Sequence, residues 1–141
     1  MATKTYSFKY GSGKKEFSLD PSLVIDELKI KDFPVLPDPE AAIRDAIRNP
    51  IDSKPLREIV KPGQTVAFIV NDPTRVANSH VFMPILLDEL NEVGVPDKDM
   101  FVIFALGAHR LMTDAEMAEA VGPQVAKRVR MYNSDCKDDS Q

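Results

Sequence analysis

Two short polar stretches hold the side chains best suited to chemistry in this sequence. Asp72, Thr74 and Arg75 follow one apolar run, and His109 and Arg110 follow a second. An imidazole can exchange a proton near neutral pH. A guanidinium offers a planar fork of donors that fits a carboxylate or a phosphate. The two stretches therefore predict an acid/base group close to an anion-binding group.

Four of these five side chains also have a purely structural explanation. Arg75 could form a local ion pair with Asp72, and Asp72 could serve only as a turn former before Pro73. The Thr74 hydroxyl could cap its loop, and His109 could hydrogen-bond a loop carbonyl. Residue types alone leave the functional and the structural interpretation open.

The apolar runs before the two stretches are the elements that would position them. Residues 65–70 and 100–106 are unbroken apolar runs, typical of parallel strands covered on both faces. The segment between them has apolar residues at helical spacing and places Gly94 at a C-terminal cap. Pro84 suits a first turn, which predicts a helix start near residues 80–82. Strand, helix and strand form a βαβ unit with parallel strands.

In an open parallel sheet, ligands bind beyond the carboxyl ends of the strands. Three loops lie there: 71–75, 107–110 and 133–136. Neighbouring strands are about 5 Å apart, so side chains from these loops can reach one pocket. The expected pocket residues are Asp72, Thr74, Arg75, His109 and Arg110.

The other elements complete an α/β fold class: a Rossmann-like, mostly parallel sheet flanked by helices, with an N-terminal β-hairpin. The hairpin is predicted from alternating apolar residues around a glycine-bearing turn. Asp38 should cap one helix, Ser53 should lead a short second helix, and Thr113 with Glu116 has capping-box spacing. Residues 128–132 predict a third parallel strand.

Composition excludes several classes of function. The chain has 141 residues and a net charge of −4, so it has no overall basic field for nucleic acid or an anionic membrane. No apolar run is long enough to cross a bilayer, and the single cysteine, Cys136, fits a reducing compartment. We therefore expect a cytoplasmic protein. With two histidines and one cysteine, a metal site made by this chain alone is not expected.

Three motifs in order give a resemblance to the N-terminal domain of the nickel-pincer lactate racemase family. Asp-x-Thr-Arg stands at 72–75, Gly-x-His-Arg at 107–110 and Thr-x-x-Glu at 113–116. The resemblance covers essentially the whole chain. Two positions depart from the family's pattern: Val76 stands where proline is common, and Ala108 replaces threonine or methionine.

The resemblance implies a 2-hydroxy-acid racemase or epimerase, with lactate the leading substrate. It implies a nickel-pincer nucleotide cofactor (pyridinium-3,5-bisthiocarboxylic acid mononucleotide nickel) that accepts a hydride from C2. By residue, it implies that His109 is one of two acid/base histidines and that Arg75 holds and polarises the substrate. Asp72 would support the cofactor or the substrate site, and Asp72 and Thr74 are the expected cofactor-binding residues. The second histidine, the lysine that attaches the cofactor and the histidine that ligates nickel should lie beyond residue 141.

Residues 1–141 are accordingly interpreted as a single catalytic domain, a fragment of a longer two-domain protein. Its partners would be the small 2-hydroxy acid and the C-terminal domain of the same protein, and the fragment alone should be inactive. An alternative is a non-catalytic α/β module that binds a nucleotide or anionic ligand through Arg75 and Arg110. A degenerate relative kept for structural reasons is a third possibility.

Overall fold

The computed structural model describes residues 3–75 and 77–139, which form two compact units, Met1–Val35 and Leu36–Gln141. Val76, one of the two departures from the family pattern, lies outside the described residues. Among the described residues, no helix has the length and apolar character needed to cross a bilayer. The single-domain interpretation of residues 1–141 stays a prediction.

The first unit contains the predicted hairpin. Strands β1 (Lys4–Tyr10) and β2 (Gly13–Leu19) pair antiparallel, and Gly11 in the turn has φ +57°. The ring of Phe17 stacks on those of Tyr6 and Phe8, which places these three rings on one face of the hairpin. A short 3-10 helix, η1 (Pro21–Leu23), follows, and residues 24–37 contain no helix or strand.

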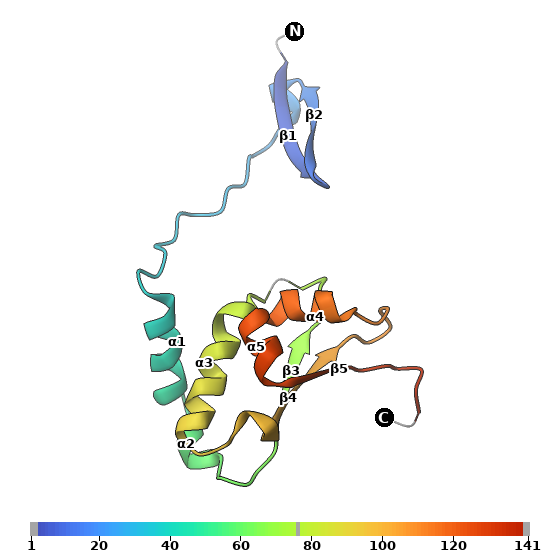
Figure 1. The fold of residues 1–141 in the computed structure, drawn as a ribbon. Helices are drawn as coiled ribbons and strands as arrows, with labels where there is room; N and C mark the ends of the chain where they lie inside the picture. The colour runs from blue at the N-terminus through green and yellow to red at the C-terminus, as the bar shows by residue number, and fades with distance from the viewer. Residues whose placement is uncertain (1–2, 76, 140–141) are drawn as a thin grey trace. The chain divides into compact units, whose positions relative to one another are not determined.

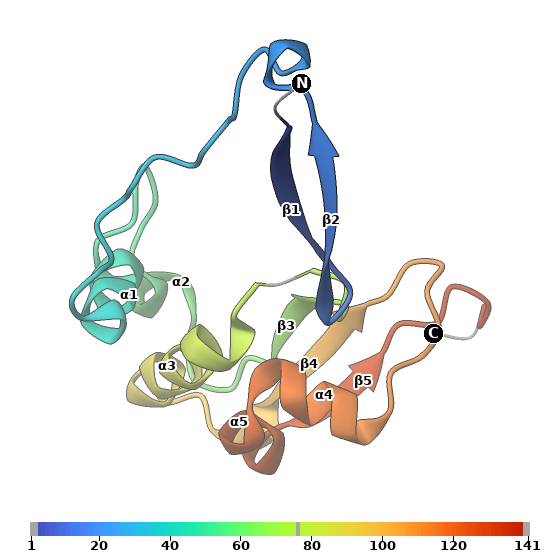
Figure 2. The same cartoon turned by 90° about the horizontal axis from the view of Figure 1, so that it is seen from above.

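The second unit carries the parallel sheet, with its elements labelled in Figure 1. Its elements are α1 (Pro39–Arg48), α2 (Leu56–Ile59), β3 (Val66–Asn71), α3 (Ser79–Glu92), η2 (Asp97–Asp99), β4 (Met100–Ala105), α4 (Asp114–Val121), α5 (Pro123–Arg128) and β5 (Arg130–Asn133). The strand order is β3-β4-β5 and both pairings are parallel, which confirms the predicted βαβ unit and third strand. Figure 2 shows the three strands side by side.

Helix ends follow the predicted caps with two exceptions. Asp38 accepts from the Ala41 amide at the start of α1, and Thr113 forms a full capping box at the start of α4. Ser53 does not lead α2, because that helix begins after Pro55 without a side-chain cap. Pro84 lies inside α3 rather than in its first turn, since the helix already begins at Ser79.

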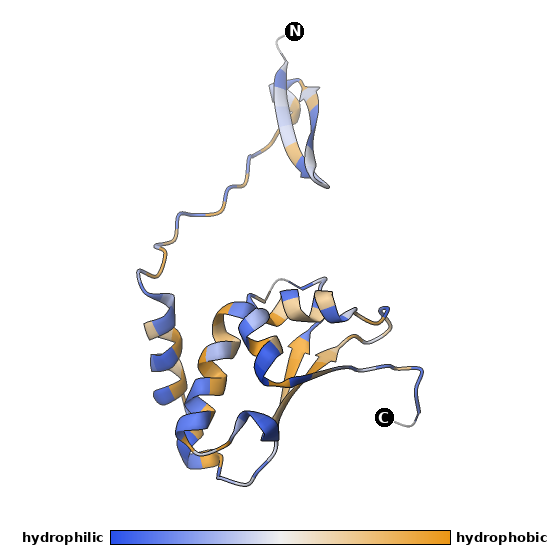
Figure 3. Ribbon diagram, in the orientation of Figure 1, coloured by the Kyte–Doolittle hydropathy of each residue, from blue (hydrophilic) through white to orange (hydrophobic). Residues whose placement is uncertain are grey.

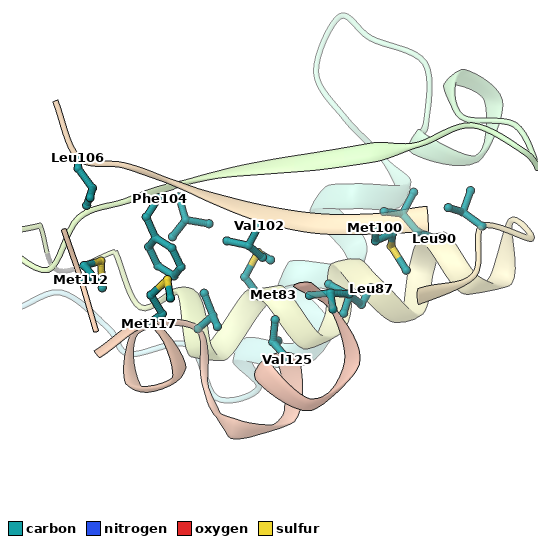
Figure 4. Close-up of a cluster of buried hydrophobic side chains, with 14 residues drawn as sticks. Met83, Leu87, Leu90, Met100, Val102, Phe104, Leu106, Met112, Met117 and Val125 are labelled. Carbon is teal, nitrogen blue, oxygen red and sulfur yellow. The ribbon is translucent and has the colours of Figure 1, made fainter. Parts of the chain in front are cut away.

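One hydrophobic core joins the helices to the sheet, and Figure 4 shows its side chains between β4 and helices α3, α4 and α5. Met83 and Leu87 come from α3, Met117 from α4, and the inward residues Val102 and Phe104 from β4. The hydropathy colours of Figure 3 show that β3 and β4 are the apolar strands of this unit. The core fixes the sheet, and through it the loops that follow each strand.

The expectation that the strands are covered on both faces is wrong for the described residues. Burial alternates along β4, and on the outward face Ile69 of β3 is 66% exposed and Tyr132 of β5 is 44% exposed. The physical reason is the strand order. Because the strands follow one another in sequence, crossovers of the same hand place α3, α4 and α5 on the same face.

Candidate functional site

The three loops after β3, β4 and β5 meet at one end of the sheet, as predicted. Asn71 at the end of β3 is in register with Ala105 at the end of β4, and Phe104 pairs with Asn133 of β5. The loops are also tied together: Leu106 N–H donates to the Ser134 hydroxyl oxygen at 3.1 Å. Cys136, further along the third loop, is an exposed free thiol.

Asp72 lies at the centre of this loop cluster and is only 7% exposed. Its Oδ1 accepts from the Thr74 hydroxyl at 2.6 Å and from the Thr74 amide at 2.9 Å. Its Oδ2 pairs with Nδ1 of His109. The Thr74 hydroxyl, together with the His109 ring, holds the pKa of the Asp72 carboxyl below its usual value even though burial opposes this shift. Asp72 is therefore an ionised group that connects two of the predicted site residues.

His109 is placed by a tight turn after β4. Gly107 has φ +56°, and the His109 amide donates to the Leu106 carbonyl at 3.0 Å. The side chain is 56% exposed and directs Nδ1 to Asp72. When Nδ1 carries the proton and donates it to the carboxylate, Nε2 keeps its lone pair and can accept a proton from a ligand. The hydrogen bond to a loop carbonyl is made by the backbone amide and not by the ring.

Arg75 lies beside this pair on the wall of a pocket of about 370 Å³. Its amide donates to the Asp72 carbonyl at 3.2 Å, but Asp72 gives its carboxylate to Thr74 and His109. The local ion pair between Arg75 and Asp72 is thus not formed. Within the part of the chain that the structure describes, the Arg75 guanidinium makes no ion pair and can take an anionic ligand.

The expectation that five side chains line one pocket is only partly met. The lining residues are Asn71, Asp72, Pro73, Arg75, Ala77, Asn78, Ser79, His80, Glu116, Glu119 and Ala120. Thr74 and His109 do not line this pocket, but both are hydrogen-bonded to Asp72, which does. Arg110 instead donates to both Glu116 carboxylate oxygens, at 2.9 Å and 2.6 Å. Glu116 binds Arg110 because the capping box of α4 already holds that carboxylate next to the loop.

Sequence reasoning missed the pairing of Asp72 with His109 and the contribution of the first turn of α3. The pairing had a readable signal, since both residues follow neighbouring strands on the same side of the sheet. The α3 turn had a weaker signal: Asn78, Ser79 and His80 look like an ordinary polar helix start. Their place on the pocket wall depends on how α3 packs on the sheet.

The described residues contain no group of three histidine, cysteine, aspartate or glutamate side chains that could hold a metal ion. They do not fit a nickel site of their own. They do offer a proton-accepting pair, Asp72 with His109, and an unpaired guanidinium on the wall of a pocket.

Comparison with known proteins gives consistent matches. A family model described as the lactate racemase N-terminal domain matches residues 10–141. The lactate racemase of Lactiplantibacillus plantarum is 30% identical over 101 residues, which cover 72% of this chain and 24% of that protein. That of Thermoanaerobacterium thermosaccharolyticum is 26% identical over 130 residues, covering 91% of this chain and 30% of that protein.

A solved structure agrees with these matches. The lactate racemase apoprotein from Thermoanaerobacterium thermosaccharolyticum has a TM-score of 0.74 and 25% identity, covering 94% of this chain and 30% of that chain. The present chain therefore spans less than a third of the length of these relatives.

Proposed function

The chain belongs to the lactate racemase N-terminal domain family, and from that premise we propose that it supplies one half of the active site of a 2-hydroxy-acid racemase or epimerase. Lactate is the leading substrate because it is the substrate in the names of the matched relatives. The observation that carries the proposal is the pair of Asp72 and His109 beside the pocket lined by Arg75. The other half of the site would come from the C-terminal domain of the full-length protein.

In this proposal the reaction begins when Nε2 of His109 removes the proton of the substrate hydroxyl. The imidazolium that forms is stabilised by Asp72, whose ionised state is favoured by its bond to Thr74. Arg75 binds the substrate carboxylate through two parallel hydrogen bonds and stabilises the charge that develops on the neighbouring oxygen. The other enantiomer would result if the hydride removed from C2 came back to the opposite face of the planar keto acid, with a second histidine outside this chain returning the proton to the oxygen.

The hydride chemistry at C2 would be supplied by a nickel-pincer nucleotide, with its attachment and nickel-ligating residues outside this chain. Asp72 and Thr74 are proposed to support this cofactor indirectly, because their polar atoms already hold the loop in shape. The 141-residue chain on its own should neither bind nickel tightly nor racemise a substrate.

The test is a racemisation assay on the full-length protein loaded with its cofactor. D-to-L conversion should be followed for lactate and for 2-hydroxy acids with longer side chains. Conversion of at least one of them, absent from the isolated chain, is the expected result. Turnover by the isolated chain would refute the half-site proposal. A loaded full-length protein that binds anions without turnover would favour the non-catalytic module.

A further inference from the structure

The first turn of α3 is an uncapped helix start on the wall of the pocket. Asn78, at the N-cap position, has left-handed backbone angles (φ 53°, ψ 37°) and makes no side-chain capping bond. Its carbonyl accepts from the Val81 amide at 2.9 Å. The amides of Ser79 and His80 have no acceptor in the described part of the chain. Such amides, with the positive end of the helix dipole, attract an anion.

Ser79 adds an independent observation. It is only 5% exposed, yet it lines the pocket, and its hydroxyl has no hydrogen-bond partner among residues 3–75 and 77–139. Every fully enclosed side-chain oxygen or nitrogen of those residues has a partner. The Ser79 oxygen must therefore reach open space, where it can donate to a ligand. An almost buried hydroxyl kept without a protein partner indicates a place for a ligand atom.

The charges around the pocket agree with an anion on its α3 side. Arg75 lines the pocket without an ion pair in the described part of the chain. Two lining acids are already engaged: Asp72 by Thr74 and His109, and Glu116 by Arg110. Glu119, from α4, remains as a lining acid and would disfavour an anion near its own carboxylate.

We infer that the amides of Ser79 and His80, the Ser79 hydroxyl and the Arg75 guanidinium form one anion seat. It would receive either the carboxylate of the 2-hydroxy acid or the phosphate of a nucleotide cofactor. The inference rests on the proposed function for the identity of these two anions. Each provides oxygens that accept from a guanidinium, a hydroxyl and helix amides together.

The experiment is an amide NMR titration of the full chain labelled with ¹⁵N-serine and ¹⁵N-histidine. One arm adds sodium L-lactate, a second adds inorganic phosphate, and sodium chloride at equal ionic strength is the reference. Saturable shifts of the Ser79 and His80 signals support the seat. A response to lactate identifies the substrate carboxylate, and a response to phosphate identifies the cofactor. Shifts no larger than those with chloride in both arms overturn it.

Two variants with matched controls test the residues. Ser79→Ala should weaken binding of the responding anion by about tenfold, the value of one hydrogen bond to a charged group. Ser53→Ala, which removes an exposed hydroxyl elsewhere, should leave it unchanged. Ala77→Glu adds a negative charge to the lining and should weaken binding at least as much, whereas Gln124→Glu on α5 should not. Wild-type affinity in both pocket variants overturns the seat.

These outcomes are separate from those of the racemisation assay. Anion binding at the Ser79 and His80 amides in a protein without turnover would refute the proposed function but support the anion seat. Turnover without that binding would refute the anion seat but support the proposed function.

Discussion

The Asp72 carboxylate and the His109 ring, 37 positions apart in the chain, are hydrogen-bonded to each other at the carboxyl end of the sheet. The bond uses Nδ1 of the imidazole and leaves Nε2 for a ligand. Asp72 is buried and hydrogen-bonded to Thr74, so its carboxylate is held in place independently of His109 and sets the orientation of the imidazole ring. The orientation of the base therefore depends on the loop after β3.

Asp72→Asn should lower kcat of the loaded full-length protein by about 100-fold or more, by analogy with other aspartate–histidine pairs. The side-chain amide can donate to Nδ1, which favours the tautomer whose proton sits on Nε2. Steady-state racemisation kinetics measure the effect. The matched control is Asp52→Asn, the same change at an exposed position with φ 49°, which asparagine tolerates. Equal kinetics for the two variants would remove Asp72 from the mechanism.

His109→Ala should lower the chemical rate by about 100-fold or more, the usual contribution of a positioned general base. Added imidazole should restore part of the rate, because the space left by the ring opens to solvent. The measurement is single-turnover kinetics with and without imidazole. Unchanged turnover in the variant would exclude His109 as the proton acceptor.

Arg75→Ala should raise KM and lower kcat/KM while leaving thermal stability nearly unchanged. The reason is that the guanidinium makes no ion pair with the described residues, so its loss should cost at most about 0.5 kcal/mol of stability. Arg75→Lys should recover only part of kcat/KM because it lacks the planar fork. Kinetics and thermal melting are measured together. A large loss of stability with normal kinetics would return Arg75 to a structural role.

Glu116 predicts a pH dependence of stability. Its bond to Arg110, with the Thr113 amide, lowers the pKa of the carboxyl from 4.5 to about 2. Because the folded pKa is depressed, the stabilisation is complete above about pH 4.5 and is lost as pH falls towards 2. Glu116→Gln keeps a capping-box residue but removes the charge.

Melting temperatures of the wild type and Glu116→Gln should therefore differ at pH 7 and converge as pH falls towards 2. A difference that stays constant across this range would show that the charge of Glu116 contributes nothing to stability.

Glu89 should stabilise the contact between α1 and α3. It is 8% exposed and accepts from Arg44 at 3.1 Å and from Arg48 at 2.8 Å and 3.1 Å. Glu89→Gln should lower the free energy of unfolding by about 1–3 kcal/mol, the range for losing buried, charge-assisted hydrogen bonds. Glu92→Gln is the matched control: the Glu92 side chain is 63% exposed and, among the described residues, forms an ion pair only with Arg48. Its loss should cost less than about 1 kcal/mol. Denaturant titration compares the two, and equal losses would contradict the role of burial.

The sequence was sufficient for most elements because their signals are local. A glycine turn between alternating strands, the Asp38 cap and the capping box of Thr113 with Glu116 each act within a few residues. The prediction that Ser53 leads α2 was wrong because Pro55, whose φ is already restricted, occupies the N-cap position and Leu56 begins the helix without a side-chain cap. The prediction that both faces of the sheet are buried was wrong because an unbroken apolar run does not show which face the crossover helices cover.

By itself the sequence determined the α/β class, the parallel strands and the end of the sheet at which Asp72, Arg75 and His109 gather. These follow from periodicity and from the rule that loops after parallel strands meet. Only the tertiary structure decided which side chains interact. Asp72 is hydrogen-bonded to His109 and does not pair with Arg75, and Arg110 is paired with Glu116. The tertiary structure also placed the start of α3 on the pocket wall. Partner choice depends on ångström-scale distances set by core packing, and a linear pattern of residue types does not contain them.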